Sequence, residues 1–434
     1  MNNFNRLRVY LAGTLLLVST AIAAATPVKS MIIFGDSLSD TGNTSHLLKS
    51  LRQEESPSYL VRPLKVFVIN KMEEFADAYY VPQMVLDAGI DKVTQFFDVE
   101  LAPMLATIIG KIKRAPVVPG EPYWQDHFSN GQVWNEYLAT MLNVTREDTR
   151  HFSNQAFGGS WTVTYDYQLT VWNLIRHPIM TLKSLIVGKL IPPSLGLTVQ
   201  AHLISTTHFD KDAVYFIFSG GNDYLNVLAF GDNYDTAVMS VYIDNVLDSM
   251  NSAVQKLTNA GAKHLVIFGI PDVGLTPHFL YTADQNVLSA AVLEHNKRLK
   301  TRIELLQHDL PLVDFLFIDV QPMFEKVLSH PSNYGFTNTT EACIDVKLPM
   351  YRGLENSPFA HNLVLQYASV LQYRNSHFAA GEKNYQMCDQ PDNYLFWDET
   401  HPSTRTHRVL AYEICLAMQD HGYQATCQDP TVVA

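Results

Sequence analysis

Four short apolar runs lie along the chain, and a turn rich in glycine, aspartate or proline follows the first three of them. The runs are Met31–Gly35, Val214–Phe218, His264–Gly269 and Phe315–Ile318, the last of which ends at an aspartate. Their length and the residues that end them are typical of buried β-strands. We therefore expect four strands, each with polar residues at its end.

Segments with apolar residues at three-to-four spacing lie between these runs and predict helices. The main ones are Ala237–Ala260, Gln285–Leu310 and Arg405–Gln419, and His295 is the one polar residue on the apolar face of the second. This alternation predicts an α/β protein with a mostly parallel sheet and helices on both faces. In such sheets, sites form in the loops at the carboxyl ends of the strands.

Two stretches, at about 50–120 and at 161–195, do not follow this alternation. The second contains Trp161 and Trp172, but Arg176 interrupts it, so it is a poor membrane span. It fits either a pair of helices at a membrane interface or an ordinary helix packed on the core. Because no linker is evident, we expect a single domain, residues 26–434, with two insertions.

The N-terminus has the pattern of a secretory signal peptide. Arg6 and Arg8 precede an apolar run that ends in alanines near Ala25. A membrane anchor is the alternative, although the alanine-rich end favours cleavage and therefore secretion or periplasmic export. Removing residues 1–25 takes the net charge from −12 to −14. An acidic protein is unsuited to nucleic acid as a partner, and 47% hydrophobic residues permit a packed core.

Four cysteines, Cys343, Cys388, Cys415 and Cys427, lie in the last quarter of the chain. An even number in an exported protein predicts two disulfides, and three pairings are open. Neighbours in sequence meet most easily, which favours Cys343–Cys388 and Cys415–Cys427. Free buried thiols are the alternative. The spacing does not predict a zinc site.

A nucleophile, a base and an orienting carboxylate can be assigned from the two ends of the chain. Ser37 follows the first apolar run, and Asp398 stands three residues before His401. A serine hydroxyl needs a base to accept its proton, and the histidine needs a carboxylate that fixes its tautomer. The chain order Ser, Asp, His is allowed, because geometry defines such a triad.

Two glycine-rich turns offer donors for an oxyanion. Gly159 lies in a Phe-Gly-Gly-Ser turn, where a substrate can approach a backbone N–H closely. Asn222 follows Gly220-Gly221 at the end of the second apolar run and supplies a side-chain amide. Each feature alone is also compatible with an ordinary turn.

Taken together, these residues resemble the GDSL family of the SGNH hydrolase superfamily. The matching positions, in chain order, are Gly35-Asp36-Ser37-Leu38, Gly159, Asn222, Asp398 and His401. The segments Phe128–Trp134 and Pro271–Pro277 also match. Ser39 is a competing nucleophile, but it falls outside the matching position.

The resemblance implies a three-layer α/β/α fold and a function without a metal or an organic cofactor. It also implies that Ser37 is the nucleophile, His401 its base and Asp398 the partner of His401. The oxyanion hole would consist of the N–H groups of Ser37 and Gly159 and the side chain of Asn222. Ser37 would form an acyl-enzyme.

Within the family, the chain resembles secreted bacterial phospholipase A and lysophospholipase enzymes, some of which are glycerophospholipid:cholesterol acyltransferases. The implied partners are a phospholipid membrane surface and cholesterol, with water or a sterol hydroxyl accepting the acyl group. The two insertions could form an apolar mouth for acyl chains or only add packing. The alternatives are a carbohydrate O-acetyl esterase or other short-chain esterase, and a non-catalytic binding protein on a hydrolase scaffold.

A disulfide between Cys343 and Cys388 would close a long loop shortly before Asp398. Ser357-Pro358 and Asn375-Ser376 give this loop an exposed-looking composition. One hypothesis is that the loop covers the site until a protease cuts it, while the disulfide keeps the pieces attached. The alternative is a disulfide that only stabilises a surface loop.

Overall fold

The computed structural model describes residues 25–53, 58–102, 119–162, 193–206, 208–225, 236–346 and 385–430. The expected signal peptide falls almost entirely on residues 1–24, which lie outside these ranges. The proposed interfacial helices at 161–195 and the disulfide-closed loop lie mostly outside them as well. These expectations therefore remain predictions.

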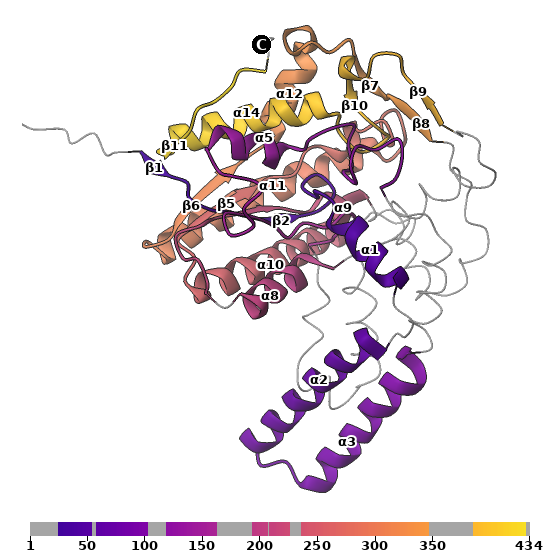
Figure 1. Ribbon diagram of the computed structural model, residues 1–434, viewed down its shortest axis with the longest axis vertical. Helices are drawn as coiled ribbons and strands as arrows, with labels where there is room; N and C mark the ends of the chain where they lie inside the picture. Colours follow the sequence, from indigo (N-terminus) through magenta and orange to yellow (C-terminus); the bar gives the residue numbers. More distant parts are fainter. Residues whose placement is uncertain are drawn as a thin grey trace, which may run out of the picture.

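A parallel five-stranded sheet forms the centre of the molecule (Figure 1). Its strands are β2 (Met31–Gly35), β3 (Phe152–Asn154), β4 (Val214–Phe218), β5 (His264–Phe268) and β6 (Asp314–Ile318), in the order β3-β2-β4-β5-β6. The four apolar runs predicted the last four strands of this order. The short edge strand β3 was missed because two of its three residues are polar.

Alternation along the strands gives the sheet two apolar faces. Ile32 and Phe34 of β2 belong to the core cluster on one face, and Met31 and Ile33 belong to the cluster on the other. All four are almost completely buried. Because successive side chains of a strand point to opposite faces, a strand buried on both faces must be apolar throughout.

Helices cover both faces and complete a three-layer α/β/α sandwich, as expected (Figure 1). One layer contains α8 (Leu195–Ser205), α10 (Thr236–Ala260) and α11 (Gln285–Asp309). The other contains α5 (Trp134–Met141) and α14 (Thr404–Asp420). The helices predicted from spacing begin or end within one residue of the observed bounds.

The buried face of α11 corrects one detail of the sequence analysis. His295 is not its only polar residue, because Asn296 is also buried. The Asn296 side chain accepts a hydrogen bond from the Ile270 N–H and donates one to the Ile270 carbonyl, both at 2.9 Å. It therefore satisfies an irregular backbone segment after β5, a role that helical spacing does not reveal.

Smaller elements complete the carboxyl-terminal part of the chain. They are α9 (Gly221–Leu225), η4 (Val273–Leu275), α12 (Gln321–Ser329), η5 (Pro331–Tyr334), β7 (Asn338–Ala342), β8 (Ile344–Val346), β9 (Tyr385–Met387), η6 (Pro391–Asn393) and β10 (Tyr394–Phe396). Strand β7 pairs with β10, and β8 with β9. Near the chain ends, β1 (Thr26–Pro27) pairs with β11 (Tyr423–Gln424).

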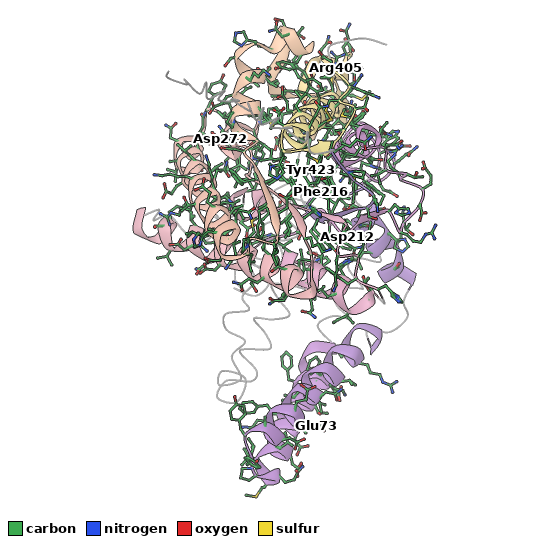
Figure 2. The ribbon with its side chains drawn as sticks, turned by 90° about the vertical axis from the view of Figure 1, so that its left-hand side faces the viewer. Glu73, Asp212, Phe216, Asp272, Arg405 and Tyr423 are labelled. Atoms are coloured by element: carbon green, nitrogen blue, oxygen red, sulfur yellow. A yellow bond between two sulfur atoms is a disulfide. The ribbon has the colours of Figure 1, made fainter. Side chains whose placement is uncertain are left out.

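The first insertion forms helices that project from the sandwich. They are α2 (Ser58–Ala78), α3 (Gln83–Gln95) and the π-helix η1 (Phe96–Leu101). Helix α1 (Asn43–Gln53), which precedes them, lies beside the sandwich (Figure 1). Figure 2 shows Glu73 on this projection, apart from the densely packed side chains around Phe216. Among the described residues, no helix has both the length and the apolar character needed to cross a membrane.

Both disulfides join cysteines in the pairing favoured from their spacing. Cys343 bonds Cys388, which holds the β8–β9 pair together. Cys415 bonds Cys427 and ties the tail after β11 to helix α14. Because Cys415 is completely buried against the sheet, this bond anchors the end of the chain to the core.

We expect the double substitution Cys415→Ala/Cys427→Ala to lower the free energy of unfolding by about 3 kcal/mol. The bond closes a short loop, with a sequence separation of 12, and so restricts the unfolded chain. Thermal unfolding should show a melting temperature several degrees lower. In reductant the difference from the wild type should shrink, and equal melting temperatures without reductant would contradict the prediction.

Candidate active site

The strand order places three loops side by side. Gly159 follows β3, Ser37 follows β2 and Asn222 follows β4, and these strands are neighbours in the order β3-β2-β4. All three are parallel, so their carboxyl ends lie at the same edge of the sheet. Three motifs that are far apart in the sequence therefore meet at one edge.

Ser37, His401 and Asp398 form a continuous hydrogen-bonded chain. The Ser37 Oγ atom lies 2.9 Å from Nε2 of His401, and Nδ1 of His401 lies 2.6 Å from Oδ2 of Asp398. The two contacting residues from opposite ends of the chain are separated by 364 positions. With Asp398 on Nδ1, the other ring nitrogen is directed at the serine hydroxyl.

The Asp398 carboxylate is held in its ionised form. Burial raises its pKa, but the neighbouring His401 and several hydrogen bonds outweigh burial and lower the pKa to about 2. Its Oδ1 accepts from the N–H groups of Thr400 at 2.8 Å and His401 at 2.6 Å. These bonds close the tight turn that presents Asp398 and His401 to the same side.

Tyr123 and Phe128 also contact this chain of residues, in roles that the sequence analysis did not find. The buried Tyr123 hydroxyl donates to Oδ2 of Asp398. The Phe128 ring packs on the His401 ring with centroids 5.2 Å apart. A single aromatic residue in a loop has no periodic pattern, so only the structure identifies these contacts.

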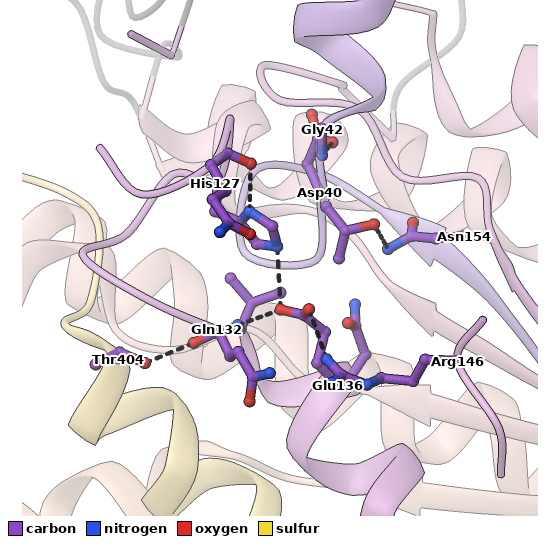
Figure 3. Close-up of polar contacts among 12 residues, drawn as sticks. Asp40, Gly42, His127, Gln132, Glu136, Arg146, Asn154 and Thr404 are labelled. Carbon is purple, nitrogen blue, oxygen red and sulfur yellow. Dashed lines mark hydrogen bonds and ion pairs between the residues drawn. The ribbon is translucent and has the colours of Figure 1, made fainter. Parts of the chain in front are cut away.

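The loop that carries both aromatic residues is braced by a buried ionic cluster (Figure 3). His127 Nε2 lies 3.1 Å from Oε2 of Glu136, whose Oε1 accepts from Arg146 at 2.9 Å. Burial lowers the pKa of His127, but contact with the Glu136 carboxylate, the Gln125 carbonyl and the charge of Asp40 together outweigh burial and raise the pKa. Glu136 also accepts from the N–H of Val133 at 2.9 Å. The cluster fixes the loop to the start of α5.

Hydrogen bonds also join this loop to the segment around His401. The Thr404 hydroxyl donates to the Gln132 carbonyl at 2.8 Å, as Figure 3 shows. The Thr404 N–H donates to the Asn130 side chain at 2.7 Å, and the Ser129 hydroxyl donates to the Pro402 carbonyl at 2.9 Å. The loop therefore holds the start of α14, just after His401, in place.

Two backbone N–H groups at the site have no partner within the described residues. They belong to Ser37 and Gly159, which is also in the left-handed region at φ +78°. The Asn222 side chain lines the same pocket as Ser37 and donates to the Ser160 carbonyl at 2.9 Å. Backbone N–H groups and side-chain amides are the kinds of donor that can stabilise an oxyanion.

Asp40 connects the Ser37 loop to the Gly159 loop. Its carboxylate accepts from the N–H of Asn43 at 2.7 Å, which caps α1, and from the N–H of Gly158 at 2.9 Å. Gly158 has no room for a side chain, because a Cβ atom would lie 2.1 Å from the Phe128 ring. One carboxylate therefore fixes the position of Gly159 relative to Ser37.

The competing serine, Ser39, is not at the site. It is completely buried, and its hydroxyl accepts from Nε1 of Trp134 at 3.0 Å. Its carbonyl accepts from the side chains of Asn135 and Asn154 at 2.8 and 2.6 Å. Ser39 therefore packs the loop against α5 and β3, while Ser37 faces His401.

An apolar pocket opens beside Ser37 and His401. Its wall is formed largely by hydrophobic side chains from α12, α14 and the loops after β2 and β4. Among them are Leu38, Leu225, Met323, Phe324, Val409 and Leu410. Glu413 also lines the pocket and binds Lys326 at 2.9 Å. The described residues contain no group of three or more His, Cys, Asp or Glu side chains placed to hold a metal ion.

Comparison with known proteins identifies related sequences. A family model described as GDSL-like Lipase/Acylhydrolase matches residues 31–414. The chain is 25% identical over 309 residues to the phosphatidylcholine-sterol acyltransferase of Aeromonas hydrophila, covering 67% of this chain and 79% of that protein. It is 22% identical over 406 residues to the GDSL esterase/lipase EXL2 of Arabidopsis thaliana, covering 88% and 86%.

A third relative is aligned over a smaller share of its length. The thermolabile hemolysin of Vibrio parahaemolyticus is 24% identical over 291 residues, which is 66% of this chain. The alignment spans about half of that relative, 54% of its length.

The buried carboxyl of Asp36 leads to a prediction about pH and stability. Burial raises its pKa to about 7, so the folded protein keeps a proton that the unfolded chain releases near pH 4. The stability due to this proton is present at low pH and is lost as the pH rises towards 7. Asp36→Asn keeps an acceptor for the Leu38 N–H and avoids this loss.

We therefore expect Asp36→Asn to become more stable than the wild type as the pH rises from about 4 to 7, by up to about 4 kcal/mol. Chemical denaturation at a series of pH values measures the difference in the free energy of unfolding between the two proteins. This difference should stay constant below pH 4. A difference that does not change with pH would contradict the raised pKa.

Proposed function

Because this chain belongs to the GDSL-like lipase/acylhydrolase family, we propose that it is a secreted serine lipolytic enzyme that cleaves acyl esters of phospholipids and lysophospholipids. The observation that carries the proposal is the hydrogen-bonded chain from Ser37 through His401 to Asp398, at the mouth of an apolar pocket. The phosphatidylcholine-sterol acyltransferase among its relatives supports a lipid substrate.

In the first step, the Ser37 Oγ attacks the ester carbonyl while Nε2 of His401 takes the hydroxyl proton. Asp398 stabilises the imidazolium that forms. The N–H groups of Ser37 and Gly159 and the Asn222 side chain would donate to the oxyanion of the tetrahedral intermediate. Its collapse breaks the ester C–O bond, and His401 returns the proton to the alcohol that leaves as lysophospholipid or glycerol phosphodiester. The acyl group stays on Ser37.

In the second step, a hydroxyl compound attacks the acyl-enzyme. His401 takes its proton, the second intermediate collapses, and the proton returns to the Ser37 Oγ. Water as the acceptor gives a fatty acid, and a sterol hydroxyl gives a sterol ester. Which acceptor reacts depends on how far the site excludes water. Transfer to cholesterol is part of this proposal.

The pocket supports fatty acyl groups over acetyl groups. Apolar residues of α12 and α14 line it, so each methylene of a chain placed there would leave water. The Lys326–Glu413 ion pair joins the same two helices. An acetyl group would leave most of this apolar wall uncovered.

Product analysis on phosphatidylcholine–cholesterol liposomes tests the reaction. We expect free fatty acid, with or without cholesteryl ester, and at least about a thousandfold less of either with Ser37→Ala. Mass spectrometry distinguishes hydrolysis from transfer. If the amounts of both products are unchanged in Ser37→Ala, Ser37 is not the nucleophile. Inactivity on lipids together with rapid cleavage of acetyl esters would favour the carbohydrate O-acetyl esterase.

The same assay after limited proteolysis tests the proposed activating protease. The Cys343–Cys388 bond would keep the chain joined after a cut within residues 347–384, which lie outside the described residues. Activity that rises only after cleavage, with the disulfide intact, supports activation. Equal or lower activity after cleavage identifies the loop as a stabilising one.

Met323→Trp tests the pocket. The larger ring should fill the space beside Phe324 and Leu410, and so lower kcat/KM for long-chain p-nitrophenyl esters about tenfold relative to butyrate esters. The matched control is Met387→Trp, at an exposed methionine of β9. A chain-length profile that is unchanged in Met323→Trp would place the acyl group elsewhere.

A further inference from the structure

The projecting helices end in an exposed apolar turn. We call the turn between α2 and α3, residues 78–86, the tip. Its sequence, Ala-Tyr-Tyr-Val-Pro-Gln-Met-Val-Leu, contains no charged residue, and Asp77 and Asp87 border it. Tyr80 is 92% exposed, Met84 81% and Tyr79 70%. An apolar segment of this kind on a protein surface marks an interaction site.

The tip has a defined shape. The Val81 N–H donates to the Ala76 carbonyl at 2.9 Å and ends α2, and the Val85 N–H donates to the Pro82 carbonyl at 2.9 Å as α3 begins. The Tyr79 ring packs on Phe75 with centroids 4.4 Å apart. Exposed side chains on a turn fixed by its own backbone need little ordering when they bind.

Tyr80 occupies a backbone conformation that suits glycine better. Its φ is +53°, in the left-handed region where helices commonly end on glycine. Because the ring is exposed, it makes little packing contact that would offset the strain of this conformation. Glycine would therefore replace Tyr80 without straining the turn, so Tyr80→Gly removes the ring and leaves the shape of the tip.

The position of the tip favours a deformable lipid surface as its partner over a flat, rigid protein surface. Figure 1 shows α2 and α3 projecting from the sandwich, with the tip at the far end. Helices α2, α3 and η1 pack on one another. They follow α1, which begins shortly after Ser37, so the projection is rooted at the same edge of the sheet as the site. A convex apolar tip can enter a lipid surface without a complementary groove.

The charges around the tip select the kind of lipid. Among the side chains that the structure describes between residues 72 and 95, exposed carboxylates outnumber exposed ammonium groups, of which Lys92 is the one found. The exposed acids are Glu73, Glu74, Asp77, Asp87 and Asp91. Anionic lipid repels such a surface. The quaternary ammonium of a choline headgroup attracts carboxylates and binds the faces of tyrosine rings.

We propose that the tip docks this protein on bilayers rich in choline headgroups. Tyr79 and Tyr80 lie at the level of the headgroups, where tyrosine is enriched at membrane surfaces, and Met84 and Val85 enter the acyl region below them. The proposal concerns where the protein docks and stands apart from what the site cleaves.

Vesicle sedimentation with protein carrying Ser37→Ala tests it without lipid turnover. We expect binding to phosphatidylcholine vesicles, weaker binding to phosphatidylethanolamine and still weaker binding to phosphatidylglycerol. Adding Tyr80→Gly should weaken binding to phosphatidylcholine at least tenfold, with the melting temperature equal or higher because glycine relieves the left-handed strain. Unfolding therefore cannot explain the loss.

Tyr281→Gly is the matched control. Tyr281 is also an exposed tyrosine, 84% accessible, with a φ of +67°, but it lies in the sandwich beside Thr282 and Asp284. Its substitution should leave vesicle binding unchanged. An equal loss in both variants, no binding by the parent protein, or a preference for phosphatidylglycerol would overturn the proposal.

Two further measurements separate lipid docking from other roles. A tryptophan placed by Tyr80→Trp should be quenched by brominated phosphatidylcholine, and the absence of quenching would contradict insertion. If light scattering shows a dimer for the parent protein and a monomer for Tyr80→Gly, the tip instead binds a second copy of the chain. In protein with Ser37 intact, Tyr80→Gly should leave hydrolysis of a soluble short-chain ester unchanged, so this test and that of the proposed function can fail independently.

Discussion

The contact between the Ser37 hydroxyl and Nε2 of His401 joins the first strand of the sheet to the last major helix, and much of the structure serves to hold it. A distance of 2.9 Å between residues 364 positions apart requires both segments to be fixed independently. The sheet fixes Ser37 through β2, which is paired on both sides. The loop that carries Phe128, braced by Glu136 and bonded to Thr404, fixes the segment of His401.

Two buried carboxyls at the site have pKa values shifted in opposite directions, and their surroundings explain the difference. Asp398 faces His401, Tyr123 and two N–H donors, which stabilise its charge and hold its pKa at about 2. Asp36 lies next to the nucleophile, but burial dominates and raises its pKa to about 7. One carboxylate is thus kept ionised beside the histidine, while the other can remain neutral beside the serine.

The protein combines a hydrogen-bonded site with a projecting element, and none of the described residues of α2, α3 and η1 belongs to the two core clusters on the sheet. Residues of α12 and α14 line the apolar pocket, whereas most of the exposed large apolar side chains described in the first insertion lie at the turn between α2 and α3. The insertion was expected either to line a mouth for acyl chains or to add packing. Its described helices α2, α3 and η1 pack on one another, and none of their residues lines the pocket. Residues 103–118 of the insertion lie outside the described residues, so both expectations remain predictions. The proposed lipolytic function would need both a site for one acyl chain and a means of staying at the lipid surface.

The sequence alone determined the strands β2, β4, β5 and β6 and the main helices, because these depend on local patterns of side chains. Short motifs also identified Ser37, Asn222, Asp398 and His401 as candidate site residues. It also favoured the two disulfide pairings through short separation. The edge strand β3, the contacts of Tyr123 and Phe128, the link from Asp40 to Gly158 and the direction of the first insertion were decided by the tertiary structure. Each depends on groups brought together from distant parts of the chain, and no local pattern records which partners the folded chain will place within hydrogen-bonding distance.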